Sequence, residues 1–84
     1  MDISYSPKFI KQYSRLSDDV KDMAEEKENI FKLDNFDSRL KTHKLHGRLS
    51  GYYSFSVNFK YRIIFSYYNE TRVRFDSIGT HDIY

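Results

Sequence analysis

Hydrophobic and polar positions follow two different periods in the two halves of the chain. In residues 7–33 the apolar side chains recur every three to four positions, which is the spacing of one face of an α-helix. From Tyr53 to Phe59 apolar and polar side chains alternate one by one, and from Tyr61 to Tyr67 they do so except at Ile64. This second pattern indicates strands with one covered face. A shorter alternation at residues 3–5 predicts a first strand before the helices.

Capping residues divide the helical part into two helices. Ser6 is a favoured N-cap, and Pro7 suits the first helical position because its missing N–H would be unpaired there anyway. Ser17 begins a second helix, with two carboxylates in its first turn where the helix dipole favours them. We expect a helical hairpin, followed at residues 33–44 by a loop with one helical turn near Leu40.

The strands complete the predicted architecture. A hairpin turn is expected at residues 69–70, and Gly79 should end the last strand. The order of elements is therefore β-α-α-β-β-β, an α+β fold in one domain spanning residues 1–84. The helical hairpin should pack on one face of a small, mostly antiparallel sheet. Because the helices can cover one face only, the face carrying Ser54, Ser56, Arg62 and Arg74 is expected to be open.

Composition narrows the class of protein. Eight Tyr and seven Phe are more aromatic residues than a core of this size needs, so some should lie at the surface. The absence of Cys removes disulfides and thiolate metal sites. No signal peptide is recognisable, and no apolar run approaches the roughly 20 residues that span a bilayer. We expect a soluble, cytoplasmic protein that does not enter a membrane.

Charge is divided unequally along the chain. Residues 1–40 contain seven Lys and Arg against nine Asp and Glu, a net charge of −2, whereas residues 41–84 contain seven against three, a net charge of +4. All three histidines are in the second half. This distribution favours one surface that binds an anionic partner. The alternative is that helices simply carry more solvated charge pairs than strands.

Two segments of the second half are candidates for binding phosphate. Five of the eight residues in segment 41–48 are basic, and they are Lys41, His43, Lys44, His46 and Arg48. A histidine can also exchange protons near neutral pH. Arg62 lies in a half-buried strand close to Lys60, and its guanidinium can hold a phosphate with two hydrogen bonds. The alternatives are an ordinary solvated loop and a salt bridge from Arg62 to Asp76.

The last six residues form a third candidate segment. His81 can carry a proton, and Tyr84 can stack on a base, if the segment folds over the sheet instead of fraying at the chain end. A zinc site built from His43, His46 and His81 or Asp82 is weakly supported, because three histidines without Cys fix no geometry. We therefore expect neither a metal nor a cofactor.

Three stretches together resemble the RelE/ParE superfamily of bacterial toxins. They are His43-Lys44-Leu45-His46-Gly47, the strand from Gly51-Tyr52 that leads to Tyr61-Arg62-Ile63-Ile64-Phe65, and the ending Gly79-Thr80-His81-Asp82-Ile83-Tyr84. The opening Ser6-Pro7-Lys8-Phe9 fits the same pattern, so the resemblance covers nearly the whole chain. The ending and the His before Leu-x-Gly look most like the YafQ-like branch.

The resemblance implies a fold, an activity and a partner. The fold is the microbial RNase-like order of elements derived above. RelE-type members cleave mRNA in the A site of the small ribosomal subunit without a metal, inhibit translation, and are blocked by an antitoxin in a hetero-oligomeric complex. ParE-type members share the fold but poison DNA gyrase. The chain is accordingly expected to be an mRNA endoribonuclease, with a gyrase inhibitor or a non-catalytic binding module as alternatives.

Individual positions take roles from the same resemblance. His43 matches a proton carrier or substrate-orienting His, Arg62 an Arg that stabilises charge on the phosphate, and His81 a His after the last strand. Tyr84 matches an aromatic residue that stacks on the base, and Lys41 and Lys44 lie near the family's basic residues. The chain departs from YafQ-like toxins at three positions, where an acid, a His and a further acid are replaced by Ser54, Ser56 and Lys60.

Overall fold

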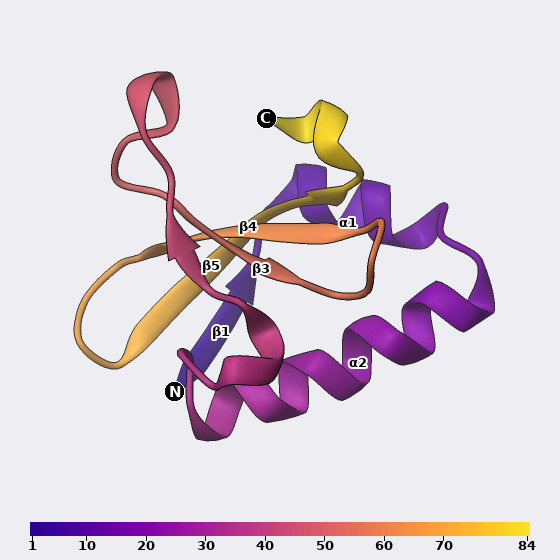
Figure 1. Cartoon of the computed structure of the whole chain (residues 1–84), viewed down its shortest axis with the longest axis horizontal. Coiled ribbons are helices and arrows are strands. Elements are labelled where there is room, and N and C mark those ends of the chain that lie inside the picture. The colour runs from indigo at the N-terminus through magenta and orange to yellow at the C-terminus, as the bar shows by residue number, and fades with distance from the viewer.

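The computed structural model describes residues 1–84 as two helices, five strands and three short 3-10 turns (Figure 1). The elements in chain order are β1 Asp2–Tyr5, α1 Pro7–Ser14, α2 Asp18–Leu33, η1 Ser38–Leu40, β2 His43–Lys44, η2 Gly47–Leu49, β3 Tyr53–Ser56, β4 Arg62–Tyr67, β5 Arg72–Gly79 and η3 His81–Ile83. No helix is long and apolar enough to cross a membrane.

Both helices begin at the predicted caps. The Ser6 hydroxyl accepts a hydrogen bond of 2.9 Å from the Phe9 N–H, and the Ser17 hydroxyl accepts one of 3.4 Å from the Val20 N–H. The predicted helical turn near Leu40 is also present as η1. Local capping therefore fixes where the hairpin starts and turns.

The strands form one mixed sheet in the order β1-β5-β4-β3-β2. β1 runs parallel to β5, and the other neighbours are antiparallel. This arrangement confirms the predicted α+β fold. Sequence analysis did not predict β2, which has two residues and pairs with β3 at an edge of the sheet.

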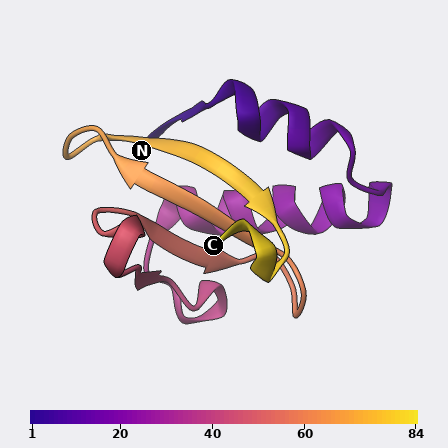
Figure 2. The same ribbon diagram turned by 90° about the horizontal axis from the view of Figure 1, so that it is seen from above.

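The core lies between the sheet and the two helices (Figure 2). Phe31 of α2 is fully buried, and its ring centroid lies 5.0 Å from that of Phe55, 4.8 Å from Phe65 and 5.3 Å from Phe75. These three rings come from β3, β4 and β5 respectively. Phe31 thus packs against all three central strands and anchors α2 to the sheet.

The opposite face of the sheet is covered at its centre, where sequence analysis predicted an open surface. Ser54 is fully buried there, and Ile64 and Ser77 are nearly so. Figure 2 shows why, because the yellow C-terminal turn lies in front of the strands while α2 lies behind them. The central polar residues of this face, Ser54 and Ser77, are therefore buried beneath the C-terminal turn.

The alternating pattern from Tyr53 to Phe59 also predicted Phe59 wrongly as a strand residue with its side chain on the covered face. β3 ends at Ser56, and Phe59 lies in the turn between β3 and β4 with 97% of its surface exposed. The alternation of apolar residues continues through the turn, but the hydrogen bonds of the ladder do not. The side chain consequently contributes nothing to the core.

Candidate functional site

Arg62 begins β4, and its guanidinium is held by main-chain oxygens. Its Nη1 donates 2.9 Å to the carbonyl of Asn58 and 3.4 Å to the carbonyl of Tyr61. The alternative of a salt bridge to Asp76 is wrong, because Asp76 lies 3.6 Å from Arg74 Nε instead. Arg62 is thus oriented without being neutralised, which leaves a positive charge able to bind an anion.

The C-terminal turn is folded over the sheet and held there by a hydrogen bond. The Tyr84 hydroxyl and the Ser54 hydroxyl lie 2.6 Å apart, with Ser54 at the centre of β3. The rings of His81 and Tyr84 meet edge to face, with 5.8 Å between centroids. Residues 81–83 form a 3-10 turn, so the alternative of a frayed end does not hold.

Gly79 allows this close approach of the turn to the last strand. A Cβ atom built at Gly79 would lie 2.4 Å from Cγ2 of Ile83, well inside the range of real contacts. The strand can therefore pass beneath the turn because residue 79 has no side chain. Sequence analysis named Gly79 only as the end of a strand and Ser54 only as a residue of an open face, and it did not predict their contacts with Ile83 and Tyr84.

His43 lies at the edge of the same face. In β2 it is paired with Ser54, the residue that contacts Tyr84. Its Nδ1 lies 3.1 Å from the carbonyl oxygen of Lys41, which can only accept, so Nδ1 is the donor. In a neutral ring Nε2 is then the nitrogen that can take up a proton.

The sheet register sets these side chains side by side. One row runs from His43 through Ser54 and Ile64 to Ser77, and the next row contains Ser56, Arg62 and Gly79. Adjacent strands are about 4.8 Å apart, and residues two apart on a strand are separated by about 7 Å. The register thus places His43 and Arg62 on the same face of the sheet, and the turn that carries His81 and Tyr84 packs on that face through the Ser54–Tyr84 contact.

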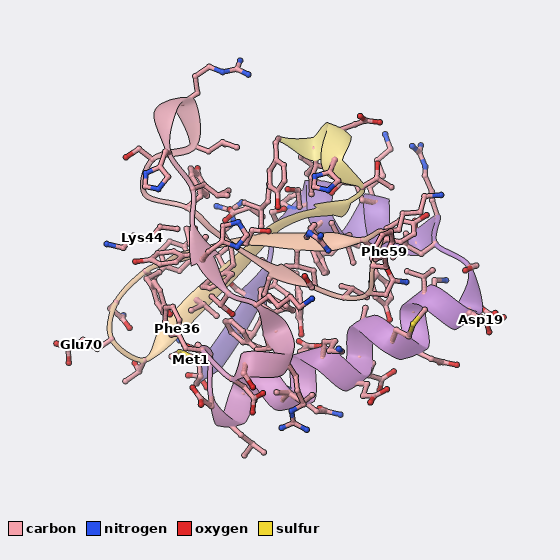
Figure 3. The ribbon with its side chains drawn as sticks, viewed as in Figure 1. Met1, Asp19, Phe36, Lys44, Phe59 and Glu70 are labelled. Carbon is pink, nitrogen blue, oxygen red and sulfur yellow. The ribbon has the colours of Figure 1, made fainter.

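The remaining predicted phosphate-binding residues are spread more widely. Lys60 lies in the β3–β4 turn near Arg62, with its ammonium 5.9 Å from the centroid of the Tyr61 ring. Lys41 is exposed in the left-handed backbone conformation that ends η1, and Arg48 is exposed on η2. Lys44 and His46 line a separate hollow of about 440 Å³ that includes Tyr53 and Tyr67, and Figure 3 shows Lys44 pointing away from the molecule.

A second hollow lies between the C-terminal turn, which contributes Ile83, and the start of α1, which contributes Pro7 and Lys8. Its volume is about 540 Å³, and its lining residues are Ser6, Pro7, Lys8, Leu49, Tyr52, Ile64, Arg74, Asp76, Ser77 and Ile83. Burial raises the pKa of the Asp76 carboxyl, although the Ser66 hydroxyl and the charge of Arg74 oppose this rise. Asp76 accepts a hydrogen bond of 2.8 Å from Ser66.

No group of three or more His, Asp or Glu side chains lies close enough to hold a metal ion. In particular, the three histidines do not converge as the zinc alternative required. The chemistry available to the site therefore comes from the imidazoles, the guanidinium and the tyrosine hydroxyl.

The fold of this chain matches solved structures of bacterial toxins, whereas sequence comparisons find no match. No protein-family model matches the chain, and no curated protein matches its sequence. Among solved structures, the YoeB/ParE toxin from Agrobacterium tumefaciens superposes with a TM-score of 0.81 at 16% identity, covering 96% of this chain and 99% of that one. The YoeB–YefM complex from Staphylococcus aureus gives 0.78 at 20% identity, covering 96% and 97%. These two likenesses show the fold.

The RelE/ParE toxin fold indicated by the sequence is thus confirmed. The chain is also similar to YafQ from E. coli, with a TM-score of 0.76 and 27% identity over 98% of this chain and 94% of YafQ. YafQ in the E. coli DinJ–YafQ toxin–antitoxin complex superposes with a TM-score of 0.72 at 28% identity, over 98% of this chain and 93% of that one. Two of these four structural neighbours are complexes, YoeB with YefM and the toxin–antitoxin pair of YafQ with DinJ.

Proposed function

We propose that this chain is the toxin of a toxin–antitoxin system and that it inhibits translation by cleaving mRNA in the ribosomal A site. The observation that carries the proposal is the arrangement of Arg62, which is oriented by the Asn58 carbonyl and has no carboxylate partner. It lies one residue row from the Ser54–Tyr84 contact. A positive charge beside two proton-carrying groups is what phosphodiester cleavage requires.

In the proposed reaction the 2′-OH of one nucleotide attacks the adjacent phosphate. The P–O bond to the 5′-oxygen of the next nucleotide breaks, which leaves a 2′,3′-cyclic phosphate and a free 5′-OH. One histidine of the His43 and His81 pair takes the proton from the 2′-OH, and the other protonates the leaving oxygen. Arg62 stabilises the charge that builds on the phosphate, and Tyr84 orients the base by stacking.

The same proposal gives the outlying basic residues a role in binding RNA and names the partners of the chain. Contacts to neighbouring phosphates of the mRNA are assigned to Lys41, Lys44, His46, Arg48 and Lys60. Their spread around the face suits a strand of RNA that crosses the site in an extended conformation. An antitoxin that binds this chain in a hetero-oligomer would control the activity, as the complexes of the structural neighbours suggest. The reaction needs no metal or cofactor.

Primer extension on a translated reporter mRNA tests the proposal. The wild type is expected to give discrete cuts within codons, and Arg62→Ala is expected to lower cleavage by about 10²–10³-fold because a preorganised charge is lost. Arg72→Ala is the matched control, since Arg72 is exposed at the opposite end of the sheet. Arg62→Lys retains the charge without the planar fork and should be intermediate.

Thermal unfolding of each variant separates loss of chemistry from loss of fold. Intact mRNA alongside continued growth arrest by the wild type would refute the proposal. It would move the target to DNA gyrase or another protein that the same fold can bind without chemistry.

A further inference from the structure

Phe59 is the most exposed large hydrophobic side chain of the molecule. It is 97% exposed, whereas every other Phe packs its ring against another aromatic ring. Figure 3 shows Phe59 at the end of the β3–β4 turn, on the side of the molecule away from Lys44 and Glu70. A Phe in water contributes little to folding, and its ring is accessible to a partner.

The turn that carries Phe59 is well ordered by its own hydrogen bonds. The side-chain oxygen of Asn58 accepts from the N–H of Lys60 at 2.9 Å and from the N–H of Tyr61 at 2.8 Å. The N–H of Val57 donates 2.9 Å to the carbonyl of Tyr61, and the Asn58 amide reaches the sulfur of Met23 in α2. Phe59 is therefore held outward by a fixed backbone.

The same turn orients the guanidinium of the candidate site. The carbonyl that accepts from Arg62 belongs to Asn58, the residue before Phe59. Along β3 the order is Ser54, which contacts Tyr84, then Ser56, which is paired with Arg62, then the turn. Along the strands, Arg62 thus lies between the row that carries the Ser54–Tyr84 contact and the turn that carries Phe59.

We propose that Phe59 is a second base-stacking residue, which binds the base flanking the phosphate held at Arg62 on the side away from Tyr84. The inference rests on the proposed function and names a contact to the RNA beyond it. An exposed ring is a suitable surface for a base, because every base has a π-face and stacking tolerates any sequence. Lys60 beside it supplies charge for the next phosphate. Two stacked bases would hold the intervening phosphate against the guanidinium.

The test measures the rate of cleavage of a translated reporter mRNA at several toxin concentrations. Phe59→Ala is expected to lower kcat/KM by about 5- to 100-fold, the range measured for loss of one stacked base, with the cut positions unchanged. Phe59→Trp should restore cleavage to the wild-type rate or above. Phe36→Ala is the matched control, since Phe36 is 57% exposed and packs on Tyr53 away from the turn.

The outcomes separate this inference from the proposed function. If the wild type cleaves and Phe59→Ala cleaves equally well, only the stacking role is overturned. Should that variant also bind the antitoxin more weakly, Phe59 belongs to a protein interface instead. If the wild type does not cleave at all, the proposed function fails and the stacking role fails with it. The two Phe59 variants should unfold at the wild-type temperature, because a side chain that is 97% exposed carries little stability.

Discussion

Replacing Gly79 by alanine puts a methyl group where the C-terminal turn already lies. The added carbon would be 2.4 Å from Cγ2 of Ile83, about 1 Å closer than ordinary van der Waals contact allows. Gly79 is paired with Arg62 of β4, and this pairing holds the strand in place at residue 79. The turn has to lift instead, and it carries His81 and Tyr84 with it.

The size of the effect follows from this overlap. Forcing an extra methyl group into a packed contact typically costs about 1–3 kcal/mol. The contact that opposes lifting is chiefly the hydrogen bond between Tyr84 and Ser54, which contributes about 0.5–1.5 kcal/mol net. The free-energy cost of the added methyl group is therefore larger than the free energy that the hydrogen bond contributes. A displacement of about 1 Å at a reacting group can cost on the order of 100-fold in rate.

The experiment compares Gly79→Ala with a double variant that relieves the overlap. Leucine has no branch at Cβ, so Ile83→Leu removes the offending Cγ2, and the next atom of residue 83 is 3.8 Å away. We expect Gly79→Ala to lower mRNA cleavage by about 10- to 100-fold. The double variant Gly79→Ala, Ile83→Leu should regain most of this loss, and Ile83→Leu alone should cleave like the wild type.

Two results would refute the reasoning. Gly79→Ala with wild-type activity would mean that the turn does not need its observed position. A double variant no more active than Gly79→Ala would mean that the damage comes from the strand and not from the overlap with Ile83. Urea unfolding should show that Gly79→Ala loses less stability than a core substitution, because the main change is in the turn.

Two further predictions concern side chains on the same face of the sheet. A double-mutant cycle of Ser54→Ala and Tyr84→Phe, measured by urea unfolding, should give a coupling energy of about 0.5–1.5 kcal/mol, and a value near zero would mean that the two hydroxyls do not interact. Because burial raises the pKa of Asp76, the folded state binds this proton more tightly than the unfolded chain, and stability is lost as pH rises from the ordinary Asp pKa near 4 through the raised pKa of the folded state. Asp76→Asn should therefore be more stable than the wild type at pH 7 and lose this advantage at pH 3, and an equal difference at both pH values would contradict the assignment.

Elements with local signals were predictable from the sequence. Ser6 and Ser17 cap the helices where a hydroxyl before a helical pattern is expected to cap them, and the turn at residues 69–70 follows from its residue types. The apolar face of each strand also emerged correctly at Phe55, Phe65 and Phe75. In each case the information lies within a few residues of the element.

Features that depend on distant contacts were not predictable in this way. The two residues of β2 are too few to show a period, and they form a strand because they pair with the edge of β3. Phe59 continues the alternating pattern in sequence, although the strand itself ends at Ser56. Ser54 appeared as the replacement of an acid, and its burial beneath Tyr84 depends on a segment 30 residues later.

The parallel pairing of β1 with β5 has a consequence for the order in which the molecule is made. The first strand of the chain has no partner until the last strand has been synthesised, since β5 separates β1 from the rest of the sheet. The turn with His81 and Tyr84 follows β5 directly. A nascent chain consequently contains the helical hairpin and the β3–β4 pair long before it contains a finished face. Assembly of the candidate site therefore waits for β5 and for the turn that follows it.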